Sequence, residues 1–390
     1  MKSVFMIIFL VFAFFSCSPE YQKIDKIMEK GVEVVLNHLE PYKIKGEPAS
    51  LHLEEEFAID TEKDTIAEAG LADINSFDVD SEGNIYFFQE RESEKYLVCK
   101  FDEKGRFIKS FIKRGQGPGE IQIPIYQPLS KRNEILIQDY GRRMLFIYDS
   151  QGSLAGEIRL KASGAGLSVL IPLENGNYIE FRDCIDPSSK HRCDIMDLRN
   201  SSFEEIKELD RGDYGSPFMT SLEKKKGWPR VFIGEISRGM IYMGNESRGY
   251  EILIYNLDGK LLKKIRKEYR PADVPEAFKE NLLINFPLLK LKDRLIIPDK
   301  MPPFHYFFLD DEGRLYVKTY EKGLAENECI HDIFNSAGCF IKRMSLSGYG
   351  NWMYPGRDLN KPKLKNHHFY CIREKKSGYK ELVVYKMNWN

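Results

Sequence analysis

Apolar and polar residues alternate along much of this chain, and short turns rich in Asp and Gly interrupt the alternation. The clearest example runs from Phe77 to Phe87, where the turn Asp80-Ser81-Glu82-Gly83 separates two alternating runs. Period-two alternation is typical of β-strands, and Asp followed three positions later by Gly is typical of a tight turn. This stretch therefore predicts a β-hairpin.

A second hairpin follows at once, with its turn at Asp102-Glu103-Lys104-Gly105. We expect the first hairpin to join the two inner strands of a four-stranded sheet and the second to join its two outer strands. The outer signature returns at Asp149, at a degenerate copy around Asp197, at Asn256 and at Asn335, and a partial sixth copy ends near Tyr385-Lys386.

The outer signatures recur at a nearly constant interval. Asp102 and Asp149 are 47 residues apart, and Asp149 and Asp197 are 48 apart. A period of roughly 40–50 residues with four short strands each is the mark of a β-propeller. The pattern predicts an all-β fold, a six-bladed β-propeller.

The ends of the repeat predict how the ring closes. Blade six has three strands, near Leu364, residues 368–372 and residues 382–386, whereas a strand at 50–53 has no blade of its own. Pairing this N-terminal strand with the last blade would remove an open edge.

The fourth and fifth signatures, Asn256 and Asn335, are 79 residues apart. Residues 271–291 fill the excess with helical spacing of apolar side chains, and Asp273 is placed to cap such a helix. We therefore expect a short helical insertion between blades four and five.

The stretch Arg114-Gly115-Gln116-Gly117-Pro118-Gly119-Glu120 predicts a stiff crossover from blade one to blade two. It is not a phosphate loop, because no Gly-Lys-Ser/Thr follows and the next segment is a strand. Propellers bind ligands where such loops converge on the channel mouth. The candidate contacts there are Arg114, Gln116, Arg142 and Arg143, and the alternative for each is an ordinary surface charge.

The N-terminus has the pattern of an export signal. Lys2 precedes an unbroken apolar run at residues 4–15, too short to span a bilayer, and Cys17 follows. We expect a signal peptide at 1–16, a lipid-anchored tether and leading strand at 17–46, and the propeller at 47–390. Within the tether, residues 21–30 predict a flexible segment or short helix and residues 31–36 a strand. The alternative is an ordinary cleaved signal with an incidental cysteine.

Composition narrows the class of partner and site. Lys and Arg (58) nearly balance Asp and Glu (59), which argues against nucleic acid. No C-x-x-C pair occurs, so no zinc site is predicted.

Cys184 and Cys193 flank a turn centred on Ser188-Ser189 that would set them opposite each other, either as a disulfide or as two free thiols. The remaining cysteines are expected to be small buried residues: Cys99, Cys329, Cys339 and Cys371.

Catalytic motifs are absent from the sequence. It has no H-E-x-x-H and no G-x-S-x-G, and we predict no cofactor and no metal. His367 and His368 are adjacent, so in a strand they would point to opposite faces. Asp310-Asp311-Glu312-Gly313 lacks the ligand spacing of an EF-hand and is expected to be a solvated hairpin turn.

Three motifs carry a resemblance to a known family: Gly-Asn-Ile-Tyr at 83–86, Lys-Phe-Asp-x-x-Gly-Arg-Phe-Ile at 100–108, and the seven-residue crossover motif at 114–120. Together they resemble the NHL-related 6-bladed β-propeller family of bacterial exported proteins, over roughly residues 31–390. Many of its members look like lipoproteins, in keeping with Cys17. The family has no settled biochemical activity, so the resemblance implies fold more than function.

The sequence thus predicts an exported, lipid-anchored, monomeric protein of the cell envelope. We expect a binding or interaction module for an unknown ligand or envelope protein, attached to a membrane through its lipid. The alternative is a propeller lyase or hydrolase with a metal at the central channel, whose ligands would be scattered in sequence. A bound, stoichiometric metal would distinguish the two.

Overall fold

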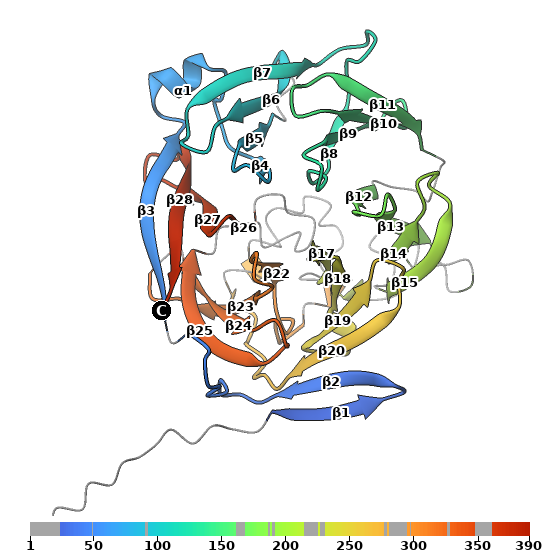
Figure 1. Ribbon diagram of the computed structural model, residues 1–390, viewed down its shortest axis with the longest axis vertical. Helices are drawn as coiled ribbons and strands as arrows, with labels where there is room; N and C mark the ends of the chain where they lie inside the picture. The colour runs from blue at the N-terminus through green and yellow to red at the C-terminus, as the bar shows by residue number, and fades with distance from the viewer. Residues whose placement is uncertain are drawn as a thin grey trace, which may run out of the picture.

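Six β-sheets stand around a central axis and form a closed ring (Figure 1). The computed structural model describes residues 24–48, 50–89, 93–160, 168–185, 188, 192–213, 225–226, 231–276, 279–280, 295–296, 298–325, 328–347 and 361–390. The signal segment, Cys17 and most of the predicted helical insertion at 271–291 lie outside these residues. Within the described part of the chain, no helix has the length and apolar character needed to cross a membrane.

The first three blades follow one another along the chain, each with its strands in order from the axis outward. Blade one contains β4 (Ser76–Val79), β5 (Ile85–Phe88), β6 (Tyr96–Phe101) and β7 (Phe107–Lys113). Blade two contains β8 (Pro124–Tyr126), β9 (Ile135–Asp139), β10 (Met144–Tyr148) and β11 (Leu154–Arg159). Blade three contains β12 (Ser168–Pro172), β13 (Tyr178–Ile185), β14 (Arg192–Arg199) and β15 (Glu205–Asp213).

The other three blades complete the ring. Blade four contains β17 (Phe232–Ser237), β18 (Met240–Asn245), β19 (Glu251–Asn256) and β20 (Leu261–Lys267). Blade five contains β22 (Tyr306–Leu309), β23 (Leu315–Lys322), β24 (Glu328–Phe334) and β25 (Phe340–Ser347). Blade six contains β26 (Lys363–Lys365), β27 (His368–Glu374), β28 (Lys380–Trp389) and the N-terminal β3 (Leu51–Asp60). The short elements elsewhere are α1 (Asp64–Glu68), η1 (Glu246–Arg248), β16 (Lys225–Lys226) and β21 (Leu295–Ile296).

Ring closure follows the sequence prediction. β3 pairs antiparallel with β28 from Glu381–Asp60 to Trp389–Leu51, and so supplies the outer strand that blade six lacks. Gly105, in the outer turn of blade one, lies against Phe57 of β3. A Cβ on Gly105 would stand 2.6 Å from the Phe57 ring, and its φ of +74° also favours glycine. The two ends of the ring are therefore packed together as closely as neighbouring blades elsewhere.

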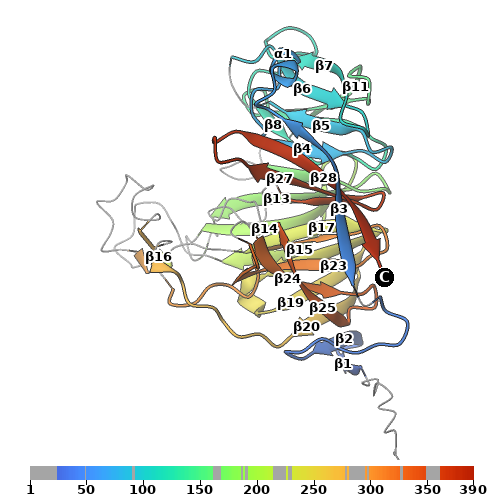
Figure 2. The same cartoon turned by 90° about the vertical axis from the view of Figure 1, so that its left-hand side faces the viewer.

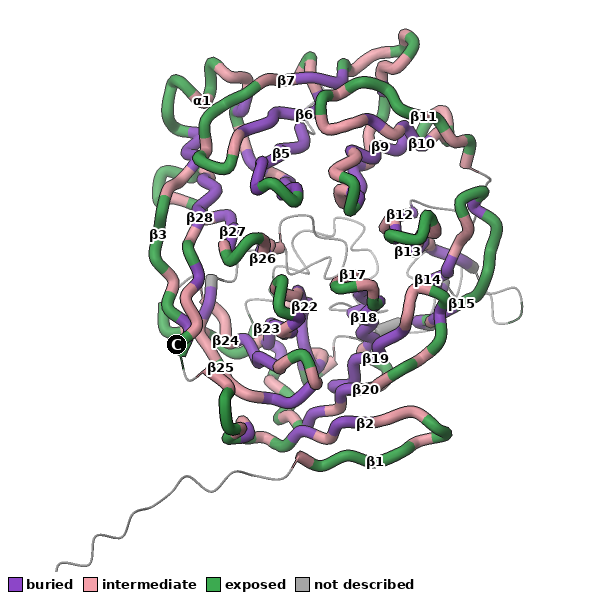
Figure 3. Tube along the Cα trace, in the orientation of Figure 1, coloured by how far each residue is buried: buried purple, intermediate pink, exposed green. Residues whose placement is uncertain are grey.

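The hydrophobic core lies between the blades rather than at the axis. Separate clusters of buried side chains join blades six and one, one and two, two and three, and three and four, and a larger one spans blades four to six. The strands in the middle of the blades are the most buried: all of β9 is buried, for example, whereas the outer strand β11 is mostly exposed (Figure 3). This pattern explains why the middle strands read as apolar runs and the outer strands as alternating ones.

The N-terminal segment differs from its prediction. Residues 25–29, where we expected a flexible tether or short helix, form the strand β1 (Asp25–Glu29). β1 forms a hairpin with the predicted leading strand β2 (Val32–Asn37), which in turn pairs parallel with β20 of blade four. The spacing of Ile24, Ile27 and Met28 suggested a helix, but the backbone N–H and C=O groups here pair with β2 instead. Ile27 and Met28 are exposed, so they do not form the buried face that a helix would need.

The outer turn of blade three also corrects the sequence analysis. The structural counterpart of Asp102 and Asp149 is Asn200, not Asp197, because Asn200 accepts the backbone N–H of Ser202 and of Glu204 at 2.9 Å each. Phe203 takes the left-handed position, φ 60°, that glycine holds in the other outer turns. Its ring stacks on Tyr178 at 4.6 Å, and this packing offsets the backbone strain.

Antiparallel order gives the disc two distinct faces. The crossover face carries the connections between blades and the turns between the second and third strands of each blade. The turn face carries the first-to-second and third-to-fourth turns. Seen from the side, β16 projects from one side of the disc, and it pairs with β21 from the following inter-blade connection (Figure 2).

Candidate functional site

The residues that we proposed as channel-mouth contacts lie on the crossover face, around the loop after β7. Arg142 donates hydrogen bonds to the backbone carbonyls of Glu120 (3.0 Å) and Gly115 (3.1 Å). Asp139 is fully buried and accepts from the Gln122 N–H at 2.9 Å. Arg142 is therefore occupied in holding the crossover in shape.

The other three proposed residues divide into one bonded and two exposed side chains. Arg114 donates to the carbonyls of Gln122 and Gln89 at 3.4 Å each, which fastens the same loop to blade one. Gln116 and Arg143 are exposed. The structure thus brings Arg114 and Arg142 to one loop as supports, and leaves only Gln116 and Arg143 free to meet a ligand there.

A pocket of about 380 Å³ lies on the opposite, turn face, between blades five and six. It is lined by the inner turn of blade five, the inner turn of blade six and the end of β28, and its lining includes Asp310, Asp311, Glu312, Arg314, Leu364, Lys365, His367, His368, Lys386, Met387, Asn388 and Trp389. Leu364 and Met387 are buried and supply an apolar floor.

Turn length explains why a pocket opens here. The inner turns of blades one and five each place five residues between their strands, 80–84 and 310–314. Blade six places only Asn366 and His367 between Lys365 and His368, which are paired. Both turn residues have positive φ, 50° and 60°, as a two-residue hairpin requires. Blade four has an equally short inner turn, but there Arg238 reaches the Glu312 carbonyl at 2.7 Å, whereas on the blade-six side the space beside the longer turn stays open.

The wall on the blade-five side is a pre-arranged polar network. Asp310 accepts the N–H groups of Glu312 (3.0 Å) and Arg314 (2.8 Å) and the hydroxyl of Tyr316 (3.1 Å). Burial raises the pKa of Asp310 above its ordinary value, although the Arg314 N–H and its charge act in the opposite direction. Trp389 Nε1–H donates to the Tyr316 hydroxyl at 3.1 Å. These bonds fix both the turn and the indole ring.

Arg314 connects the acidic turn to the aromatic wall. Its guanidinium contacts Glu312 at 2.6 Å and Asp310 at 3.4 Å, and it lies 5.0 Å from the centre of the Trp389 ring. Two of the three carboxylates of this turn thus share one guanidinium. The Trp389 ring, held by Arg314 and Tyr316, offers a rigid flat surface of the kind that ligand pockets use.

The two adjacent histidines both line this pocket, contrary to the strand argument. His367 sits in the turn with φ 60° rather than in the strand, so the rule of alternating faces does not apply to it. His367 is exposed and its N–H contacts Asp311 at 3.4 Å. His368 is held more firmly, by Glu56 of β3 at 2.9 Å and by the Asn366 carbonyl at 2.8 Å.

Unlike the exposed Lys386, Lys365 is the half-buried lysine of the pocket. Its side chain is half-buried, and it has no hydrogen-bond or ion-pair partner among the residues that the structure describes. Burial, followed by the positive charge of Lys131, lowers the pKa of Lys365. Lys363, two residues earlier, instead lies 3.6 Å from Asp78.

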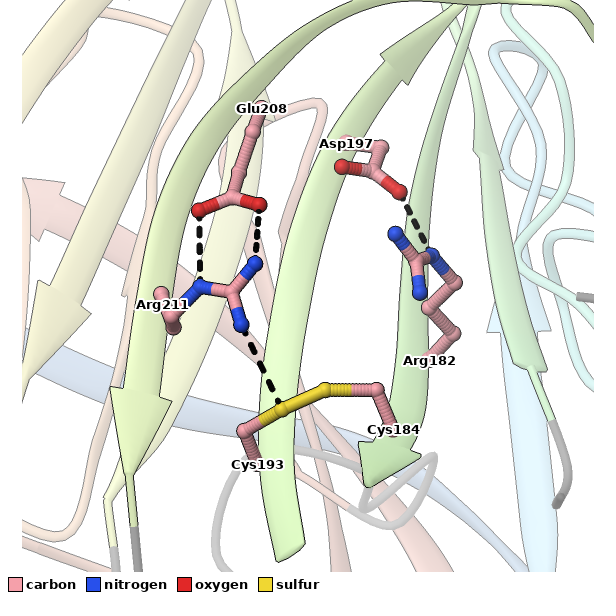
Figure 4. Close-up of a disulfide and its surroundings, with 6 residues drawn as sticks. All are labelled: Arg182, Cys184, Cys193, Asp197, Glu208 and Arg211. Atoms are coloured by element: carbon pink, nitrogen blue, oxygen red, sulfur yellow. Dashed lines mark hydrogen bonds and ion pairs between the residues drawn. A yellow bond between two sulfur atoms is a disulfide. The ribbon is translucent and has the colours of Figure 1, made fainter. Parts of the chain in front are cut away.

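The disulfide between Cys184 and Cys193 lies elsewhere, in blade three (Figure 4). The two residues are directly paired across β13 and β14, as the turn at Ser188 predicted, with Cα atoms 5.1 Å apart. Arg211 of β15 donates to the Cys193 sulfur at 3.6 Å and to both carboxylate oxygens of Glu208, at 3.0 and 2.6 Å. This bridge is a structural tie between strands that end at the crossover face.

Among the described residues, no group of three or more His, Cys, Asp or Glu side chains is arranged to bind a metal ion. The channel-metal alternative stays a prediction. Trp389 and Lys365 were not predicted from the sequence as site residues. The one local signal was Asn366, a residue that tolerates the left-handed conformation and so hints at a two-residue turn.

The comparisons with known proteins bear on the fold. Residues 73–226 match the model of DUF5128, a family described as a 6-bladed beta-propeller. A solved structure from Bacteroides fragilis, of a protein thought to be exported, is 11% identical with a TM-score of 0.51, over 92% of this chain and 99% of that one. A member of the DUF4221 family from Bacteroides vulgatus is also 11% identical, with a TM-score of 0.49 over 88% and 100% of the two chains.

No curated protein is similar enough to count as a relative. At these identities the solved structures inform the fold alone. The chain is an all-β six-bladed propeller, and its residues 73–226 are similar to the DUF5128 six-bladed propeller family.

Proposed function

We propose that this protein is an exported binding module, anchored to the membrane by a lipid on Cys17, that takes its ligand in the turn-face pocket between blades five and six. One observation carries the choice of site: the two-residue turn of blade six leaves a walled space of about 380 Å³ beside a pre-arranged indole and several charged groups. Pockets of this size with an apolar floor and a few convergent polar groups are typical ligand sites.

Export and anchoring rest on the leader. A charged n-region, an apolar run at 4–15 and Cys17 together support export followed by lipidation. The resemblance to NHL-related exported lipoproteins agrees with this proposal. Cys17→Ser should move the protein from the membrane fraction to the soluble fraction, whereas Cys329→Ser, which also removes a thiol, should leave it on the membrane. Unchanged membrane association, with no acyl mass on the N-terminus, would refute the anchor.

The binding role is tested by a screen of small metabolites, peptides and glycans on the purified protein, read as a rise in melting temperature. Ligands of the pocket should lose their effect in Trp389→Ala, which removes the flat wall. They should keep it in Tyr379→Ala, which removes an exposed aromatic of the same blade from its crossover-face turn. Ligands that act equally on both variants would place binding outside the pocket and overturn the proposed site.

A further inference from the structure

We infer that the turn-face pocket is selective for a small organic monocarboxylate that also carries hydrogen-bond donors, with Lys365 as the residue that binds its carboxylate. This inference rests on the proposed function and specifies the chemistry of its ligand.

Lys365 loses hydration free energy in the pocket without gaining, within the described part of the chain, a partner in return. A half-buried ammonium loses part of its hydration, and Lys365 regains nothing from a partner among the described residues. Lys131, Lys363, Asp78 and Asp311 are the charged groups whose fields reach it. Asp78 is already engaged by Lys363 at 3.6 Å and by the Leu129 N–H at 2.9 Å. A half-buried charge without a fixed partner in a pocket points to binding rather than to stability.

The charges of the pocket lining are separated between the two blades. Asp310, Asp311 and Glu312 of blade five balance Arg314, Lys365 and Lys386 in number, and Arg314 pairs with two of those acids, whereas both lysines lie on blade six. A ligand with one carboxylate for Lys365 and hydrogen-bond donors for the acidic turn matches this separation. Phosphate, with its higher negative charge, would meet repulsion from the acidic turn.

The pocket walls also indicate the chemistry of the rest of the ligand. Asp311 and Glu312 present carboxylate oxygens, and Asn388 presents an amide, so the walls offer acceptors for hydroxyl or ammonium groups. Trp389 and the apolar floor of Leu364 and Met387 suit a ring or an aliphatic body. Sugar acids and amino acids share this chemistry, and the experiment separates these two sources.

The test is calorimetric titration of the purified full-length protein with two matched pairs, glucuronate against glucuronamide and phenylalanine against phenylalaninamide, with inorganic phosphate as a further probe. In at least one pair the acid should bind about tenfold or more tightly than its amide, the effect of one charged hydrogen bond. The pair that shows the difference identifies the source. Phosphate should not bind.

Lys365→Met provides the decisive variant. It keeps the aliphatic stem and removes an unpaired charge, so the melting temperature should be unchanged or higher while the preference for the acid disappears. Lys376→Gln, an exposed lysine at the opposite end of β27, should change neither property. Equal binding of acid and amide, preference unaffected by Lys365→Met, or failure of both acids to bind would each overturn this inference. The proposed function would still stand if a neutral ligand from the screen lost binding in Trp389→Ala.

Discussion

Arg266 holds Glu29 through two contacts, Nη1 to Oε1 at 2.8 Å and Nη2 to Oε2 at 3.1 Å. Arg266 belongs to the outer strand of blade four and Glu29 to the N-terminal β1, so this pair fastens the hairpin to the disc. The same guanidinium contacts Glu251 at 2.5 Å. The segment then passes blade five, where Asn37 accepts the Phe340 N–H at 2.7 Å, and ends as the closing strand of blade six.

The Glu29 pair predicts that acid loosens the hairpin. The Arg266 hydrogen bond, with a second from Lys264, lowers the pKa of Glu29 from 4.5 to about 2. A depressed pKa means that the pairing contributes fully above the ordinary value and is lost as the pH falls toward 2. Hydrogen exchange of residues 25–37 should therefore accelerate in acid, and Glu29→Gln should produce the faster exchange already at neutral pH. Lys26→Gln, which breaks an exposed pair with Glu33, serves as the control; equal protection in all three proteins would contradict the role of Glu29.

His331 predicts a second pH effect, which acts in the core of blade five and not at the N-terminal hairpin. It is fully buried, and burial together with the charge of Lys318 lowers its pKa to about 3. Between about pH 3 and 6.5 the unfolded chain binds a proton that the folded protein does not, so stability falls as the pH is lowered below 6.5.

Urea unfolding at several pH values should show this slope. His331→Leu should remove a contribution of roughly 1.4 kcal/mol per pH unit in that window, the value for one proton. His52→Gln, at an exposed position, should leave the slope unchanged. A His331→Leu slope identical to that of the parent would show that another group carries the acid sensitivity.

The disulfide predicts a measurable loss on reduction. Cys184 and Cys193 close a loop with a sequence separation of only 9, and such short loops give about 2–3 kcal/mol. The double variant Cys184→Ser/Cys193→Ser should lose that much stability and become insensitive to reductant. Thiol titration of Cys17→Ser in denaturant should count only Cys99, Cys329, Cys339 and Cys371. Six reactive thiols would show that the bridge does not form.

Ring closure predicts that a single change in β3 weakens the whole disc. Ile59 is 1% exposed, is paired with Leu382, and lies in the cluster between blades six and one. Ile59→Ala should cost about 2–5 kcal/mol and lower one cooperative melting transition. Glu54→Ala, exposed in the same strand, should have little effect. A separate early transition for β3 alone would contradict closure as a cooperative feature.

The repeat was readable from sequence because its signals are local. Asp80 and Gly83, or Asp102 and Gly105, mark turns through their own backbone chemistry, and alternation marks the strands between them. The register of blade three was not readable, because Phe203 replaces the turn glycine and a nearby buried Asp197 imitates the signature. The strand β1 was not predicted because it depends on pairing with β2 and on the contact between Glu29 and Arg266, which is distant in sequence.

The candidate site was not readable either, because its parts meet only in three dimensions. Trp389 and Asp310 are far apart in sequence and become neighbours only when blade six closes beside blade five. Lys365 differs from other lysines only in its half-buried position in the pocket lining, which the sequence does not reveal. The crossover motif at 114–120 attracted attention by composition, yet Arg142 and Arg114 there serve the loop itself.

The most direct measurement is hydrogen exchange of the full-length protein with and without a ligand that raises its melting temperature. Binding in the turn-face pocket should give new protection confined to residues 310–316, 364–368 and 386–389. Protection centred on the crossover face, at 114–120 and 140–143, with none around Trp389, would contradict it.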